Sequence, residues 1–188
     1  MPVRGATLGL LGLGRIGCAV ATRAKALGMT VIAVEPYPNQ QFVAEHEIKL
    51  VGRDTLLANS DYLSIHCPLT EETQGMIDQS WFDRMKPGCV FLNTARGQLV
   101  VEADLIQALQ SGRLRAAGLD VLEQEPPDPD NPLLQMDNVV LSPHNGGEDS
   151  LSSLNMGLEA ADCILKLYRG EWPEGCVINN ELQDGWNW

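Results

Sequence analysis

The sequence predicts an α/β protein built on a doubly wound, Rossmann-like parallel sheet. Short apolar runs alternate with helical patterns through most of the 188 residues. A glycine-rich turn, Gly12-Leu13-Gly14-Arg15-Ile16-Gly17, joins the first apolar run to the first helical pattern. Strands that alternate with helices are typical of βαβ units, which form a parallel sheet covered on both faces. Right-handed crossovers between such units produce the doubly wound arrangement.

Three strands are predicted in the first half of the chain, at Thr7–Leu11, Thr30–Val34 and Tyr62–His66. The first is a short apolar run, the second is β-branched, and the third is stopped by Pro68. The helix predicted between the first two, Ile16–Leu27, is rich in alanine and ends before Gly28. Pro36-Tyr37-Pro38-Asn39 then breaks the chain, and Asp54–Asn59 predicts a short helix.

The second half of the chain continues the alternation. Helices are predicted at Gln79–Met85, Glu102–Ser111 and about Ser150–Tyr168. Glycines just past the ends of the last two helices, Gly112 and Gly170, are typical helix stops. Strands are predicted at Cys89–Asn93, Ala116–Val121 and Val139–Leu141. The stretch from Glu123 to Asn138 is rich in proline and aspartate, which indicates a loop.

The amino-acid composition limits which partners, metal or disulfide sites and cellular location we expect. Hydrophobic residues make up 44% of the chain, which is ordinary for a globular protein and argues against wholesale disorder. The net charge of -12 argues against nucleic acid or an anionic membrane as a default partner, since both need a basic face. The five cysteines are scattered without a Cys-x-x-Cys pair, so no metal site or disulfide framework is expected. With no bilayer-spanning run and no signal peptide, we expect a cytoplasmic protein.

The glycine turn predicts a dinucleotide site. Gly12 permits the tight turn, Gly14 lets the backbone approach a pyrophosphate, and Gly17 allows the helix and strand to pack closely. Glu35 ends the second strand about 20 residues later, where such folds place an acid against the ribose 2'-hydroxyl. A 2'-phosphate would be repelled there and no basic residue follows, which favours NAD over NADP. The alternatives are a glycine turn that only packs and a solvated Glu35.

Polar residues at the predicted carboxyl ends of later strands suggest chemistry in the same crevice. Arg96 can present a guanidinium fork to a carboxylate, and Asp120 ends the next strand; the alternatives are a structural ion pair and a turn cap. His144 follows the strand Val139–Leu141. A lone histidine is most often structural, but Glu125 can fix its tautomer and support the imidazolium, which makes His144 a candidate general acid/base. His46 and His66 are interpreted as solvated and structural.

These motifs together resemble the NAD-binding domain of the D-isomer-specific 2-hydroxyacid dehydrogenases. The matching segments run in family order from about Gly5 to Gly147, and they are Leu8–Gly17, His66–Thr70, Met85–Gly88, Asn93–Gly97, Gly118–Val121 and Asn138–His144. The resemblance implies that Arg96 orients the substrate, Glu125 pairs with the histidine, and His144 shuttles the proton. Together with the three turn glycines, it implies that the cofactor is lined by Arg15, Ile16, Glu35, Pro68, Thr73, Thr94, Ala95, Arg96, Asp120, His144 and Gly147.

The resemblance also implies a missing part, because family members carry a substrate domain whose N-terminal half precedes the glycine turn. We expect an NAD-binding domain over residues 1–150 and a helix and tail over 151–188 that would pack on the absent half. The resemblance predicts a truncated NAD-dependent dehydrogenase, weakly active or inactive alone, that acts on a small D-2-hydroxy or 2-oxo acid and forms a homodimer. Alternatives are a natural short NAD-binding protein and a missing half supplied by another chain.

Two further hypotheses stay open at this point. The chain is also similar to the C-terminal binding protein corepressors, which share this fold and the Arg, Glu and His set. It would then be an NAD(H)-responsive interaction protein without catalytic activity. The tryptophan that those proteins carry soon after the histidine is absent, which counts against this hypothesis. The last alternative is an inert fragment that aggregates through an exposed apolar edge.

Overall fold

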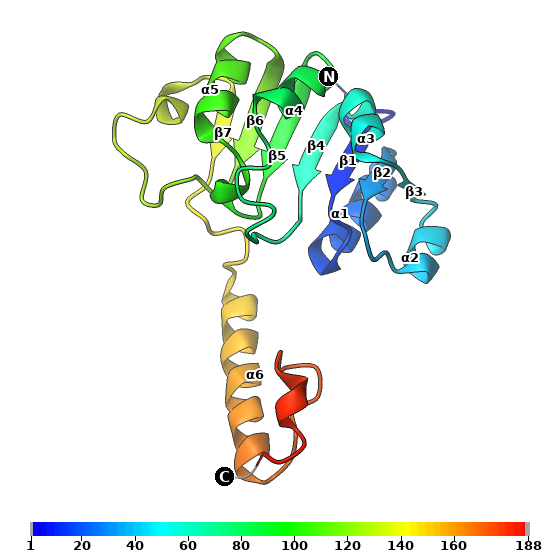
Figure 1. Cartoon of the computed structure of the whole chain (residues 1–188), viewed down its shortest axis with the longest axis vertical. Coiled ribbons are helices and arrows are strands. Elements are labelled where there is room, and N and C mark those ends of the chain that lie inside the picture. Colours follow the sequence, from blue (N-terminus) through cyan, green and yellow to red (C-terminus); the bar gives the residue numbers. More distant parts are fainter. Residues whose placement is uncertain (1, 187–188) are drawn as a thin grey trace. The chain divides into compact units, whose positions relative to one another are not determined.

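The computed structural model describes residues 2–186, and in this part of the chain seven parallel strands form one sheet (Figure 1). The strand order is β3-β2-β1-β4-β5-β6-β7. Their bounds are β1 (Thr7–Leu11), β2 (Thr30–Val34), β3 (Lys49–Leu50), β4 (Tyr62–Ile65), β5 (Cys89–Asn93), β6 (Leu114–Leu119) and β7 (Val139–Leu141). Because β1 pairs with both β2 and β4, the direction in which strands are added reverses beside β1. This reversal is the topological switch point of a doubly wound fold, and it confirms the predicted class.

Helices connect the strands as the alternation predicts. They are α1 (Arg15–Ala26), α2 (Gln40–Glu45), α3 (Arg53–Asn59), α4 (Gln79–Arg84), α5 (Glu102–Gln110) and α6 (Ser150–Tyr168). The predicted helices are all present, and their ends differ from the expected ones by no more than a residue. The sixth strand is shifted, since it begins at Leu114 and ends at Leu119 rather than running from Ala116 to Val121.

One α-helix and one strand of the described residues were not predicted. The α2 helix follows the proline-rich break and is capped by Asn39, whose side-chain oxygen accepts a hydrogen bond from Phe42 N at 3.1 Å. The β3 strand has only two residues and pairs with Ile32 and Ala33 of β2. Both elements are too short for a hydrophobic period to reveal them.

Two apolar layers lie on the two faces of the sheet. On one face, the small residues Ala21 and Ala24 of α1 pack against the strands around β1 and β2. On the other, α3, α4 and α5 supply larger side chains such as Phe82, which is fully buried. Phe82 meets Phe91 of β5 edge to face at 5.7 Å, a favoured aromatic geometry. The strands that carry the polar residues therefore rest on a packed, rigid core.

By internal packing the chain divides into two units, one up to Gly146 and one from Gly147 onwards. The second unit begins with α6, whose N-cap Asp149 accepts hydrogen bonds from Leu151 N and Ser152 N at 2.9 Å each. This helix exposes several large apolar side chains: Leu151, Leu154, Met156, Leu158, Ile164, Leu165 and Tyr168. Among the described residues, no helix combines the length and the hydrophobicity that crossing a bilayer requires.

Candidate active site

The candidate site is built from the segments that follow the strands of the first unit. Since all the strands are parallel, their carboxyl ends lie along one edge of the sheet. The glycine turn follows β1 there, and Glu35 follows β2. Arg96, Asp120 and His144 come after β5, β6 and β7 respectively. The fold thus collects at one edge residues that lie far apart in the sequence.

The glycine turn has the close approaches that its spacing predicts. Gly12 has φ +101°, and a Cβ added there would lie 2.7 Å from the His66 carbonyl oxygen. A Cβ at Gly17 would lie 2.5 Å from the Gly12 carbonyl oxygen, so α1 and β1 pack as closely as glycine permits. A Cβ at Gly14 would meet nothing within 4 Å. This open space at the first turn of α1, beside its backbone N–H groups, fits an anionic pyrophosphate.

Glu35 lies directly after β2 and is connected to the glycine turn by a hydrogen bond. One carboxylate oxygen accepts from Leu13 N at 2.8 Å, and the other accepts from Tyr37 N at 3.0 Å. A carboxylate offers about four acceptor positions. Glu35 therefore retains acceptor capacity for hydroxyl groups while the backbone holds it beside the phosphate turn, as a ribose-binding acid requires.

The segment after β4 forms a compact turn around Thr73. Its hydroxyl donates to Pro68 O at 2.8 Å and accepts from Thr70 N at 2.7 Å. His66 lies at the start of this segment, with Nε2 2.9 Å from Ser64 Oγ, and burial lowers its pKa. The His66 ring lies at the end of the sheet, and its backbone borders the glycine turn.

Asn93 shapes the turn that presents Arg96, a role that the sequence did not reveal. Its buried side chain donates to Arg96 O at 2.9 Å and accepts from Ala95 N at 3.0 Å. These two bonds close the turn after β5. The Arg96 guanidinium is exposed, and Nη1 donates to Ala95 O at 2.6 Å. Most of its donors therefore remain available to a carboxylate.

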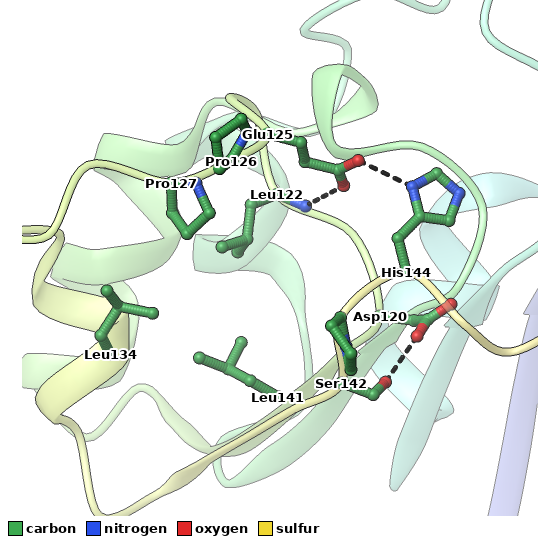
Figure 2. Close-up of a pocket in the computed structure, with 10 residues that line it drawn as sticks. Asp120, Leu122, Glu125, Pro126, Pro127, Leu134, Leu141, Ser142 and His144 are labelled. Carbon is green, nitrogen blue, oxygen red and sulfur yellow. Dashed lines mark hydrogen bonds and ion pairs between the residues drawn. The ribbon is translucent and has the colours of Figure 1, made fainter.

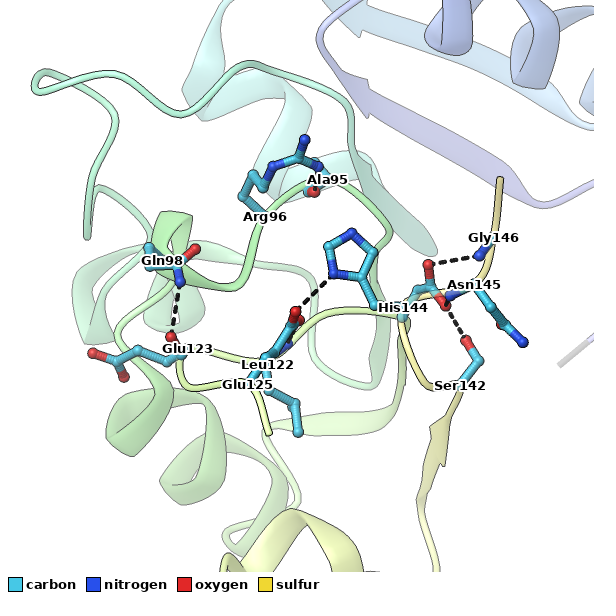
Figure 3. Close-up of polar contacts among 11 residues, drawn as sticks. Ala95, Arg96, Gln98, Leu122, Glu123, Glu125, Ser142, His144, Asn145 and Gly146 are labelled. Carbon is cyan, nitrogen blue, oxygen red and sulfur yellow. Dashed lines mark hydrogen bonds and ion pairs between the residues drawn. The ribbon is translucent and has the colours of Figure 1, made fainter. Parts of the chain in front are cut away.

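His144 and Glu125 are paired, although they are 19 positions apart in the sequence. His144 Nδ1 lies 2.7 Å from Glu125 Oε2, and the other oxygen of Glu125 accepts from Leu122 N at 3.0 Å. The hydrogen bond with His144 is the largest influence on the pKa of Glu125. Together with the hydrogen bond from the Leu122 amide, it holds that pKa below the ordinary value, although burial acts to raise it. Figure 3 shows the Arg96 and His144 side chains extending from their turns at this edge of the sheet.

Asp120 holds the loop that carries His144. One oxygen accepts from Ser142 Oγ at 2.6 Å and from Asn145 N at 3.0 Å, and the other accepts from Gly146 N at 3.0 Å (Figure 3). These bonds lie on both sides of His144, whose φ of +55° is in the left-handed region that is uncommon for histidine. Burial is the largest influence on the pKa of Asp120 and raises it. The three hydrogen bonds and the nearby His144 together outweigh burial and hold that pKa below its usual value.

The loop that carries Glu125 is held by two residues that sequence reasoning missed. Gln98 Nε2 donates to Glu123 O at 2.9 Å, and Glu102 accepts from Glu123 N at 3.0 Å. The second oxygen of Glu102 accepts from Asn131 Nδ2 at 2.7 Å. Both the backbone N–H and the backbone carbonyl of Glu123 are therefore hydrogen-bonded. No local signal could have found these contacts, because each joins residues at least 21 positions apart.

A pocket of about 430 Å³ lies beside the histidine–glutamate pair (Figure 2). Leu122, Leu134 and Leu141 contribute to its apolar lining, and Glu125 and His144 form part of its wall. An apolar surrounding strengthens hydrogen bonds between charged groups. Within residues 2–186, no group of three or more His, Cys, Asp or Glu side chains is arranged to hold a metal ion.

The remaining residues predicted to line the cofactor lie in three places. Arg15 and Ile16 are exposed at the first turn of α1, next to the open space at Gly14. Thr94 is exposed in the turn that Asn93 closes. Gly147 begins the second packing unit. The open glycine turn and the partly satisfied Glu35 carboxylate fit a dinucleotide whose ribose carries free hydroxyl groups.

Comparisons with known proteins show which family the chain resembles. Residues 1–146 match the family described as "D-isomer specific 2-hydroxyacid dehydrogenase, NAD binding domain". The D-3-phosphoglycerate dehydrogenase of Archaeoglobus fulgidus is 46% identical over 168 residues, which are 89% of this chain and 32% of that protein. The glyoxylate reductase of Korarchaeum cryptofilum is 42% identical over 96% of this chain and 54% of that protein.

Solved structures show the same likeness. The D-lactate dehydrogenase of Lactobacillus jensenii, crystallised with NAD+, superposes with a TM-score of 0.86 at 32% identity. The match covers 93% of this chain and 56% of that one. The chain thus spans between about a third and just over half of the length of these three relatives.

Proposed function

The chain belongs to the D-isomer-specific 2-hydroxyacid dehydrogenase family and matches its NAD-binding domain. We therefore propose that it is the cofactor-binding part of an NAD-dependent oxidoreductase. The reaction would move a hydride between NAD and C2 of a small D-2-hydroxy acid or the corresponding 2-oxo acid. The observation that carries this proposal is the pair of His144 and Glu125, 2.7 Å apart at the carboxyl edge of an NAD-binding sheet.

His144 is proposed as the general acid/base. With Glu125 ionised, Nδ1 keeps its proton and donates a hydrogen bond to the carboxylate. Nε2 is then left to exchange a proton with the substrate oxygen. Nε2 would take the hydroxyl proton during oxidation and return it to the oxygen during reduction. The adjacent Glu125 carboxylate stabilises the imidazolium formed in between.

Arg96 is proposed to bind and orient the acid. Its exposed guanidinium can donate two parallel hydrogen bonds to the substrate carboxylate, a geometry that fixes the position of C2. NAD, when bound, supplies the nicotinamide carbon that accepts or donates the hydride. Gly12, Gly14 and Gly17 would hold its phosphates.

Glu35 is proposed to select NAD over NADP. Its carboxylate would accept hydrogen bonds from the ribose hydroxyls and repel a 2'-phosphate. We propose a homodimer in the cytoplasm and low or no turnover by this chain alone. The last expectation rests on the length of the relatives, whose additional residues would complete the substrate cleft.

Titration of the purified chain with NADH, followed by energy transfer from tryptophan to the nicotinamide, tests the cofactor role. We expect saturable NADH binding with much weaker NADPH binding, and a reduced preference in Glu35→Gln. Glu47→Gln, which changes an exposed glutamate paired with Lys25, is the matched control. Equal binding of the two cofactors by the unmodified chain would contradict the role of Glu35.

A second experiment tests catalysis. The N-terminal half of the substrate domain of a relative is joined to this chain, and NADH oxidation is followed with a panel of 2-oxo acids. We expect turnover that falls by at least about a hundredfold in His144→Gln, since a general acid/base contributes roughly 10²–10⁴-fold. A chimera that folds and binds NADH but reduces no 2-oxo acid would instead favour an NAD(H)-responsive protein without catalytic activity.

A further inference from the structure

Two cysteines come together in the second packing unit, outside the candidate active site. Cys163 lies in the last third of α6, and Cys176 lies in the segment that follows the helix. Gly170, with φ +76°, ends the helix, and Gly175, with φ +74°, turns the chain again just before Cys176. Figure 1 shows this segment running back beside α6. The fold of the second unit therefore returns Cys176 to the helix that carries Cys163.

Hydrogen bonding places the Cys176 thiol on one face of α6. Cys176 Sγ donates to Glu159 Oε1 at 3.7 Å. Cys163 lies four residues after Glu159, so the two side chains are neighbours on the same helix face. The Cys163 thiol is the largest cause of a raised pKa at Cys176, through a side-chain hydrogen bond between the two sulfur groups, and Glu159 adds a smaller effect. The hydrogen bond to Glu159 therefore places the Cys176 thiol at the helix face that also carries Cys163.

We propose that Cys163 and Cys176 form a redox-active dithiol site that a small-molecule disulfide, such as oxidised glutathione, converts to an intramolecular disulfide. Both thiols are reduced in the structure. Cys176 is exposed and Cys163 is half-buried, so a small reagent can reach the pair. Cys89 offers a contrast in the first unit, since it is buried and burial raises its pKa to about 12, which keeps its thiol unreactive.

The exchange proceeds in two balanced steps. The Cys163 thiolate attacks one sulfur of oxidised glutathione, which forms a mixed disulfide and releases one glutathione thiolate. Cys176 then loses its proton and its sulfur attacks Cys163 Sγ, which forms the internal disulfide and releases the second glutathione thiolate. In total, two protein thiols are oxidised to one disulfide, and one glutathione disulfide is reduced to two glutathione molecules.

The product would lock the segment after α6 against the helix. In the reduced form the contacts of this segment include an edge-to-face pair of Trp172 and Trp186 at 6.1 Å. A cross-link that closes the loop from Cys163 to Cys176 removes conformational freedom from the opened state. We therefore expect the oxidised segment to open less often than the reduced one.

Equilibration of the full chain in glutathione buffers, followed by acid quenching and peptide mass spectrometry, tests the proposal. We expect a disulfide joining Cys163 to Cys176 in the native chain. The effective concentration of one thiol with respect to the other should be at least about tenfold higher in the native chain than in concentrated guanidinium chloride. In the denatured chain the two thiols are joined only by a flexible linker, which gives millimolar values. Equal values in the two conditions, or a persistent glutathione adduct at Cys176, would overturn the proposal.

Variants and a second readout separate the pair from other thiols. Cys163→Ser and Cys176→Ser should each abolish the disulfide, whereas the matched control Cys67→Ser, in the first unit, should leave it unchanged. Limited proteolysis within residues 170–186 should slow by roughly tenfold on oxidation and recover on reduction with dithiothreitol, since cross-linking restricts opening. NADH titration of the same samples reports on the proposed cofactor site independently of the dithiol.

Discussion

Replacing Asp120 by asparagine tests how the fold holds the candidate acid/base. Asp120 is only 6% exposed and accepts hydrogen bonds from Ser142 Oγ, Asn145 N and Gly146 N. The side chain of asparagine has the same shape but only one acceptor oxygen. If that oxygen keeps the bonds from Ser142 and Asn145, the new amide group faces the N–H of Gly146. The side-chain amide and the Gly146 N–H are both donors, so no hydrogen bond forms where the carboxylate accepted one.

The expected cost follows from the single hydrogen bond that is lost. A hydrogen bond to a charged group contributes about 1.5–3 kcal/mol. That free energy corresponds to roughly a 10- to 150-fold change in an opening equilibrium, since about 1.36 kcal/mol is a factor of ten. We therefore expect the Gly146 amide to exchange with solvent roughly 10- to 150-fold faster in Asp120→Asn.

Hydrogen exchange measured by NMR at single amides is the assay. Asp104→Asn is the matched control, because the Asp104 carboxylate accepts from Gln79 N at 2.8 Å away from the candidate site. The control should leave exchange at Gly146 unchanged. If Gly146 in Asp120→Asn exchanges within about twofold of the unmodified chain, Asp120 does not hold the His144 loop and the reasoning is refuted.

The pH dependence of the same loop has a defined sign. The pKa of Asp120 is lower in the folded chain than its ordinary value of about 3.9. Its contribution to stability is therefore present above the ordinary value and is lost as the pH falls through the lowered one. Exchange at Gly146, corrected for the intrinsic rate, should accelerate only at such acid pH, and Asp120→Asn should lack this acid step.

Three other substitutions have defined expected outcomes. Gly12→Ala places a Cβ 2.7 Å from a backbone carbonyl, at a position with positive φ. We therefore expect the free energy of unfolding, measured with denaturant, to fall by at least about 2 kcal/mol and NADH to bind more weakly. Unchanged stability would contradict the close approach. His144→Gln removes the largest cause of the low pKa of Glu125, so a carboxyl-carbon NMR titration should show that pKa rising; a fixed value would contradict the pairing. Glu102→Ala frees the amide of Glu123, whose hydrogen exchange should accelerate by roughly tenfold, while unchanged exchange would remove Glu102 as a support of the loop.

Much of the fold could be predicted because the buried strands and amphipathic helices are marked by periodicity and by glycine and proline. The helix at Ser150–Tyr168 begins after a capping aspartate and ends before Gly170, and its predicted range coincides with α6. The pair of α2 and β3 escaped prediction because each is short and polar or only partly buried. Strand β6 begins two residues before its predicted start. Leu114 follows an arginine-containing turn, and only its pairing with Cys89 includes Leu114 in the sheet.

The same distinction between local sequence and tertiary contacts applies to the candidate site. The sequence by itself determined the glycine turn, since the positive φ of Gly12 and the close packing at Gly17 are local demands that only glycine meets. Tertiary structure alone decided that Asp120 holds the His144 loop and that Glu102 supports the loop of Glu125. These contacts join residues 21 or more positions apart, and they form only once the parallel strands have been ordered side by side. Local sequence sets backbone conformation, whereas the partners of a side chain depend on which strands the fold makes neighbours.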